Sequence, residues 1–110
     1  MTLYQQLDTA LERLEAALKA SDLWRVPQPD AADFASAQPF CIDTMAMPQW
    51  LRYVFIARLR ALAEAEGPMP ARCDVAPAVD AYCQQAKVRA GDRLLVVKAV
   101  EEVDRLVTEN

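Results

Sequence analysis

The sequence predicts an all-α fold, a four-helix bundle made by one domain of residues 1–110, with a long proline-containing connection between helices 1 and 2. Apolar residues recur at spacings of three and four along four separate segments, as they do on the buried faces of helices. Glycine contributes 2 of the 110 residues, whereas alanine and leucine, which favour helices, are abundant. Of the 7 prolines, those at positions 27, 29, 39 and 48 lie in the predicted connection.

Residues 2–20 form the first predicted helix. Its apolar residues lie on one stripe because their spacings alternate between three and four: Tyr4, Leu7, Leu11, Leu14 and Leu18. Such a stripe packs against the other helices of a bundle. It could also support a homo-oligomer, although packing within the bundle uses the stripe first.

Residues 26–48 form the connection, because prolines at this density exclude a continuous helix. Its apolar residues would not suit a solvated linker, so we expect it to fold over one end of the core, with a short turn near residues 30–35. Four aromatic residues in or beside it are expected to cover the core, with a stacking platform for bases or an apolar ligand as the alternative: Trp24, Phe34, Phe40 and Trp50.

Three further helices are predicted at residues 47–66, 77–87 and 92–107. Asp43 or Thr44 could cap the second helix, and the residues leave that choice open. Gly67 and Pro68 end it. Asp92 is the expected cap of the fourth helix, whose apolar face continues to Val107.

Arg58 is the unusual residue of the second predicted helix. At about 100° per residue its side chain falls near the middle of the apolar side, where an unpaired guanidinium is very costly. We expect a buried or rim ion pair that holds the connection to the bundle, with Asp43, Asp74 and Asp80 as candidate partners. The alternatives are an arginine whose charged head reaches water and a site for an anionic ligand.

The same helical wheel turns Tyr53 and Ile56 toward the polar side, near Arg52 and Arg60. Tyr53, Ile56 and Arg52 therefore form a candidate interaction surface. The alternatives are scattered apolar surface residues of no special role, or coverage by another element of the chain.

The composition excludes several kinds of chemistry. The chain has no histidine, so it cannot form a Ser-His-Asp or Cys-His arrangement, and it carries neither a GxGxxG nor a Walker A loop. We expect no catalytic residue, no cofactor and no metal site. The three cysteines, Cys41, Cys73 and Cys83, are expected to be reduced and packed as small apolar residues.

Charge and hydropathy bear on partners and location. The formal charge of −4 argues against direct nucleic acid binding, which normally needs a basic face, but leaves room for a protein partner. The first residues lack the basic start and apolar core of a secretory signal, and no run reaches the ~20 apolar residues of a membrane span. We therefore expect a cytoplasmic protein with no membrane contact.

The middle of the chain carries a set of motifs: Gln38-Pro39-Phe40, Asp43-Thr44-Met45, Trp50-Leu51 and Arg58, with Trp24-Arg25, Met69-Pro70 and Ala76-Pro77 on either side. With these motifs the chain resembles the YqcC-like family of small bacterial proteins. The resemblance implies a helical bundle and brings no established activity with it. Some relatives are encoded near a tRNA pseudouridine synthase, which suggests an accessory role in RNA modification. Since Arg58 and Asp43 both belong to the motif, the resemblance also suggests that they act together.

The sequence predicts a non-catalytic protein-interaction or accessory module that uses an exposed helix face or the segment 38–47. The alternatives are a binding module for an anionic small molecule, with a pocket around Arg58, and an accessory factor linked to tRNA modification. The candidate ligand or structural residues are Arg58, Asp43, Trp50, Gln38, Phe40 and Thr44.

Overall fold

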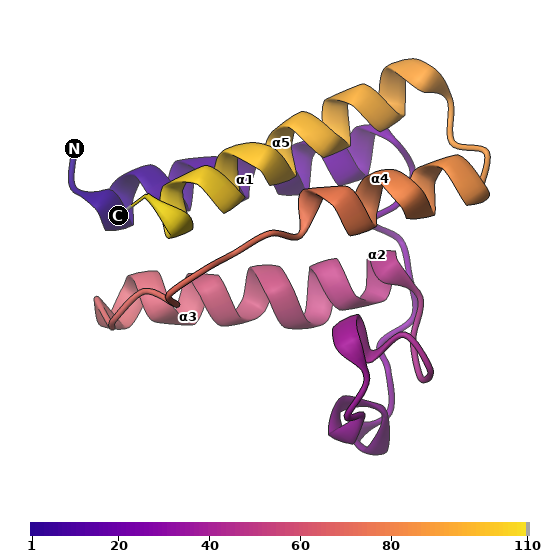
Figure 1. The fold of residues 1–110 in the computed structure, drawn as a ribbon, viewed down its shortest axis with the longest axis horizontal. Coiled ribbons are helices and arrows are strands. Elements are labelled where there is room, and N and C mark those ends of the chain that lie inside the picture. The colour runs from indigo at the N-terminus through magenta and orange to yellow at the C-terminus, as the bar shows by residue number, and fades with distance from the viewer. Residues whose placement is uncertain (110) are drawn as a thin grey trace.

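The computed structural model describes residues 1–109, and within them the chain is an all-helical bundle of four helices, as predicted (Figure 1). The second helix is continuous but consists of three consecutive pieces. The bounds are α1 Leu3–Ala20; α2 Met47–Trp50, η3 Leu51–Ile56 and α3 Ala57–Ala65 for the second helix; α4 Ala76–Gln85; and α5 Ala90–Thr108. In Figure 1, α1 and α5 lie side by side, the second helix lies below this pair, and α4 packs against α5.

The core forms between α1, α5 and the second helix. Leu7, Leu11, Leu14 and Leu18 of α1 are fully buried, which confirms the stripe predicted from their spacing. On α5, Val96, Val100, Val103 and Val107 are equally buried. Burying a leucine or valine side chain stabilises a fold by roughly 1.5–3 kcal/mol, so this layer dominates the stability of the bundle. No helix within residues 1–109 combines the length and apolar character needed to cross a lipid bilayer.

The second helix contains one π-helical turn, η3, between two α-helical pieces. A π turn acts as one inserted residue, because its hydrogen bonds run from residue i to i+5. Side chains after it are therefore displaced by about one wheel position, roughly 100°. The pattern of burial agrees with this displacement, since Val54 and Leu59 are five residues apart and both lie in the core.

Two predicted helix caps are wrong. The second helix starts after Ala46, whose backbone N–H donates to Gln49 Oε1 at 2.9 Å, so neither Asp43 nor Thr44 caps it. The last helix starts after Arg89, which places Asp92 inside its first turn. An acidic residue still favours that position, because the N-terminal end of a helix carries partial positive charge.

The connection between α1 and α2 crosses one end of the bundle and contains two short 3₁₀ turns, η1 Ala31–Ala35 and η2 Pro39–Cys41 (Figure 1). The first lies where a short turn was predicted. Phe40 and Cys41 both take left-handed backbone angles, with φ of 58° and 49°. Of the four aromatic residues predicted to cover the core, Trp24, Phe40 and Trp50 pack against it, whereas Phe34 lies half-buried in η1.

Candidate functional site

One polar face of the second helix holds the connection through backbone carbonyls. Gln49, Arg52 and Tyr53, together called the carbonyl clamp here, each donate one hydrogen bond to the segment 24–27. The bonds run from Gln49 Nε2 to the Pro27 oxygen at 3.0 Å, from Arg52 Nη1 to the Trp24 oxygen at 2.7 Å, and from the Tyr53 hydroxyl to the Val26 oxygen at 3.3 Å. The Trp24 carbonyl also accepts from the Val26 N–H at 3.0 Å, and the clamp adds side-chain donors for the carbonyls of this extended segment.

Arg52 adds a second contact to its hydrogen bond. Its guanidinium lies 4.4 Å from the centre of the Trp24 ring and 5.0 Å from that of Tyr53. A cation over an aromatic face is attracted by the negative face of the ring. Two of the three residues predicted as an interaction surface, Arg52 and Tyr53, therefore bind this chain's own connection, which is the alternative of coverage by another element.

The third residue of that predicted surface, Ile56, is fully buried, so its place on the polar side was wrong. The reason is the π turn, which displaces the wheel just where Ile56 lies. Ile56 contributes to the core together with Leu59 and Ala63 at spacings of three and four.

Arg58 is exposed, and the prediction of an inward guanidinium is wrong. After the π turn Leu59 takes the buried wheel position, and Arg58 turns to solvent. Arg58 forms no salt bridge within residues 1–109. Its three candidate partners are engaged elsewhere: Asp43 accepts from Ser36 Oγ, Asp74 lies 3.6 Å from Arg72 Nη2, and Asp80 lies 2.6 Å from Arg93 Nε. The structure therefore supports neither the predicted ion pair between Arg58 and the connection nor the predicted ligand pocket around Arg58.

The remaining motif residues lie in the folded connection and where it meets α2. Thr44 Oγ1 donates to the Asp33 carbonyl at 2.7 Å, and the Gln38 backbone N–H donates to Ser36 Oγ at 3.0 Å. The Trp50 ring meets the Phe40 ring edge-on at 5.0 Å and stacks on Phe55 at 5.4 Å. These contacts shape the connection and leave Asp43 and Thr44 exposed beside it.

A pocket of about 410 Å³ opens between the connection and α4. Its apolar rim includes Ile42, whose side chain is 70% exposed. The pocket is lined by Phe40, Ile42, Met45, Ala46, Met47, Ala78, Ala81, Tyr82 and Gln85. Residues of the predicted binding segment 38–47 thus line this pocket, whereas Arg58 does not.

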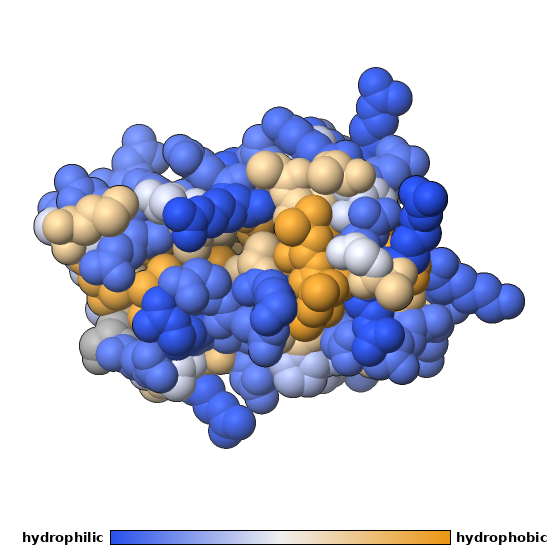
Figure 2. Space-filling view, turned by 90° about the horizontal axis from the view of Figure 1, so that it is seen from above, coloured by the Kyte–Doolittle hydropathy of each residue, from blue (hydrophilic) through white to orange (hydrophobic). Residues whose placement is uncertain are grey.

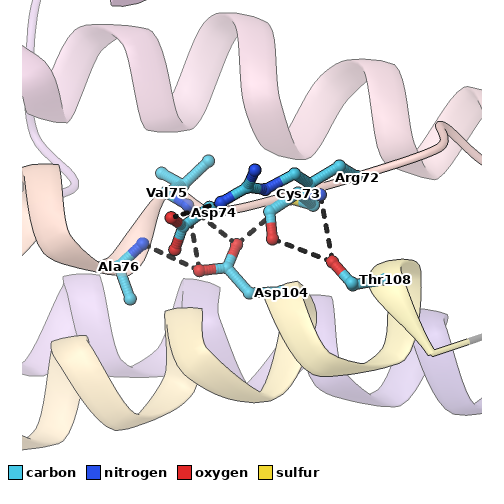
Figure 3. A network of polar contacts seen from close by, with 7 residues as sticks. All are labelled: Arg72, Cys73, Asp74, Val75, Ala76, Asp104 and Thr108. Atoms are coloured by element: carbon cyan, nitrogen blue, oxygen red, sulfur yellow. Dashed lines mark hydrogen bonds and ion pairs between the residues drawn. The ribbon is translucent and has the colours of Figure 1, made fainter.

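Asp104 on α5 organises a polar network that was not predicted from the sequence (Figure 3). Its carboxylate is 9% exposed and accepts from the backbone N–H groups of Val75, at 2.9 and 3.0 Å, and of Ala76, at 2.8 Å. These groups lie at the N-terminal end of α4, so a carboxylate on α5 caps a neighbouring helix. One turn further, Thr108 Oγ1 accepts from the Cys73 N–H and donates to the Cys73 carbonyl, both at 3.0 Å.

Cys73 also belongs to this network, because its thiol lies 3.1 Å from Asp104 Oδ1 and donates to it. Burial, and then the hydrogen bond to the Asp104 carboxylate, raise the pKa of the Cys73 thiol to about 12. Since the thiolate is the reactive form, the thiol is kept protonated and inert near neutral pH.

We expect iodoacetamide at pH 8 to alkylate Cys73 in the folded chain about 100-fold more slowly than in the urea-unfolded chain. An ordinary cysteine has a pKa near 8.5 and is partly ionised at that pH. Mass spectrometry of the peptide that contains Cys73 measures both rates. Equal rates in the folded and unfolded chain would contradict the contact with Asp104.

A second hollow lies on the outer face of α1 and α5 and is called the α1–α5 groove here. It has a volume of about 670 Å³ and is lined by Ala10, Arg13, Ala16, Ala17, Ala20, Leu95, Lys98, Ala99 and Glu102. Figure 2 views this face from above and shows apolar side chains gathered in its middle among charged ones. Leu95 is 48% exposed, and its neighbour Leu94 is 57% exposed.

The described residues contain no group of three or more cysteine, aspartate and glutamate side chains that could share a metal ion. The features that remain as candidate sites are therefore two apolar hollows on the surface. One is lined by α1 and α5, and the other by the connection, the start of α2 and α4.

These features define a class of protein: a small helical bundle with a folded connection and open apolar surfaces. The chain belongs to the DUF446 family, whose description is "tRNA pseudouridine synthase C", and the family match covers residues 6–106. The solution NMR structure of YqcC from Escherichia coli is similar, with a TM-score of 0.83 and 31% identity over 99% of this chain and 91% of that one. The predicted YqcC-like resemblance is confirmed.

Relatives of different lengths match the chain. The YqcC protein of Escherichia coli is 32% identical over 111 residues, covering 100% of this chain and 98% of that protein. A protein of Haemophilus influenzae is 37% identical over 70 residues, 64% of this chain and 66% of that protein. A protein of Pectobacterium carotovorum named tRNA pseudouridine synthase C is also 37% identical over 70 residues, but these are only 19% of its length. The last protein is therefore several times longer than this chain.

Proposed function

We propose that this chain is a non-catalytic accessory module that binds a bacterial tRNA pseudouridine synthase as its protein partner. The observation that carries the proposal is the Pectobacterium protein, in which a region similar to this chain is 19% of a longer chain named tRNA pseudouridine synthase C. Two modules in one chain meet at an effective concentration that can reach the millimolar range. A module that is a separate chain lacks this covalent link, so it must bind the enzyme with sufficient affinity by itself.

Exposed apolar surface supports a protein partner. The α1–α5 groove and the pocket at the connection both expose large aliphatic side chains. Contiguous apolar surface of this kind is typical of protein-binding faces. The formal charge of −4 disfavours the tRNA itself as the direct partner, because binding to phosphates needs a concentration of positive charge. We expect the complex in the cytoplasm, with this chain contacting the enzyme rather than its RNA.

Titration of the chain into a purified tRNA pseudouridine synthase C from the same bacterium tests the proposal. We expect a one-to-one complex with a Kd of about 1 μM or tighter, which corresponds to roughly 8 kcal/mol. Calorimetry gives the affinity and light scattering gives the stoichiometry. A pseudouridine synthase of another family serves as the control, and it should not bind.

Two results would overturn the proposal. One is the absence of a complex when both proteins are present at about 100 μM, far above the expected Kd. The other is a gel shift of tRNA by this chain alone at an affinity equal to that for the enzyme. The second result would make RNA the direct partner.

A further inference from the structure

We infer that the α1–α5 groove is the docking surface for the synthase, and that its occupant is an amphipathic helix of that enzyme whose apolar stripe is flanked by carboxylates. The inference rests on the proposed function and specifies where and how the partner binds. Its occupant follows from the shape and the charge of the groove.

The floor of the groove consists of small side chains. Ala10 and Ala17 are buried beneath it, Ala16 and Ala20 are exposed along one side, and Leu95 projects from the other. Alanines let a neighbouring helix approach closely, since packed helices lie 8–10 Å apart depending on the side chains at the contact. Leu95 would then pack against the apolar stripe of an incoming helix, as in other complexes in which a helix binds a groove.

The charges at the rim indicate the chemistry of the occupant. Arg13 and Lys98 are exposed and form no salt bridge within residues 1–109. The acidic residue of the rim, Glu102, is already bound to Arg105, with oxygen-to-nitrogen distances of 2.6 and 3.1 Å. Arg13 also acts on the Glu102 carboxylate, since its charge contributes, after the Arg105 contact, to lowering the pKa of Glu102. Lys98 is therefore the available cation beside the groove, with Arg13 shared between Glu102 and the rim. Carboxylates on the partner would complement these cations, and charge complementarity of this kind selects partners and speeds association.

The same charges disfavour a second copy of this chain as the occupant. A twofold dimer buries the same patch on both subunits, so it would bring Arg13 and Lys98 of both copies into one interface. Like charges brought together in an interface are repulsive.

The groove lies on the first and last helices, and both termini lie at the same end of that helix pair (Figure 1). Its lining runs from Ala10 to Ala20 on α1 and from Leu95 to Glu102 on α5, toward the other end of the pair. The groove therefore stays clear of both chain ends. The pocket at the connection, lined by Ile42, belongs to a different part of the bundle.

Binding of charge-introducing variants to the synthase tests the inference. We expect Leu95→Glu to weaken binding at least tenfold, because it places a carboxylate in the apolar contact, and Lys98→Glu to weaken it by about tenfold. Raising the salt concentration should weaken the wild type more than Lys98→Glu. Ile42→Glu tests the competing hollow: this exposed aliphatic residue lines the pocket at the connection, and docking on the groove predicts binding within about twofold of the wild type.

The outcomes separate the claims. Circular dichroism melting checks that each variant is folded, which the exposure of all three positions favours. Unchanged binding by Leu95→Glu and Lys98→Glu would overturn the groove while leaving the proposed function intact. A wild-type dimer that Leu95→Glu dissociates would make a second copy the occupant and overturn the inference. A wild type that does not bind the enzyme would remove the proposed function, and this inference with it.

Discussion

Replacing Asp104 by alanine is expected to destabilise the fold by about 3 kcal/mol, because two buried backbone N–H groups at the start of α4 lose their acceptor. Each buried donor left without a partner costs roughly 1–3 kcal/mol. Since small domains are stable by only about 5–15 kcal/mol, the loss is a large part of the total. Urea unfolding, followed by circular dichroism, measures it.

Two further variants show whether the carboxylate itself is responsible. Asp104→Asn keeps one acceptor oxygen and should lose about half as much, roughly 1.5 kcal/mol. Glu101→Ala changes an exposed acid on the same helix and should stay within about 0.5 kcal/mol of the wild type. If Asp104→Ala were as stable as Glu101→Ala, the helix-capping role of Asp104 would be contradicted.

Removing Arg52 should destabilise the chain by about 2 kcal/mol, whereas removing Arg58 should change the stability by less than about 0.5 kcal/mol. Arg52 donates a charge-assisted hydrogen bond to the Trp24 carbonyl and covers the Trp24 ring, whereas Arg58 extends into solvent. Both substitutions, Arg52→Ala and Arg58→Ala, exchange the same residue types within one continuous helix. The difference in helix propensity therefore largely cancels between them.

Chemical denaturation of the two variants beside the wild type makes the comparison. The fluorescence of Trp24 adds a local probe, provided that Trp50 is replaced by phenylalanine in every chain. Release of the connection should change the Trp24 emission in Arg52→Ala and leave it unchanged in Arg58→Ala. Equal stability losses for the two variants, or a larger loss for Arg58→Ala, would mean that the carbonyl clamp does not hold the connection.

Helical periodicity was sufficient to predict the helices. The stripe of α1, with Leu7, Leu11, Leu14 and Leu18, is buried as its spacing requires, and the other three helices begin and end within two residues of their predicted bounds. The proline-rich segment was also predicted as a folded connection with a turn near residues 30–35. These features depend on local patterns that tolerate small errors of position.

The prediction of the site was wrong because of one backbone feature, the π turn of the second helix. A wheel at a constant angle assumes an ideal α-helix, and the π turn η3 breaks that assumption in the middle of the second helix. Arg58 and Ile56 were therefore placed on the wrong faces. The buried residues before the π turn, Leu51 and Val54, and those after it, Leu59 and Ala63, point in different directions on a wheel of constant angle. A pattern with a constant period cannot show such a shift.

Asp104 was missed for a different reason. The apolar residues alone defined the predicted face of α5, and they leave the aspartate between Val103 and Val107 unexplained. A buried acid needs several donors, and here they come from residues 75 and 76, which are far away in the sequence. The position of Asp104 on an apolar face was enough to single it out as an unusual residue. Its hydrogen-bond partners could be identified only from the tertiary structure.

The most direct test of the proposed partner is the methyl spectrum of the chain, labelled at alanine and leucine, with and without the purified synthase. At 12.3 kDa the free chain is small enough for complete assignment of these signals. We expect the methyl signals of Ala16, Ala20, Leu95 and Ala99 to shift or broaden on binding, while those of Ala78 and Ala81 at the connection pocket stay in place. Unchanged signals throughout, or changes confined to the connection pocket, would contradict docking on the α1–α5 groove.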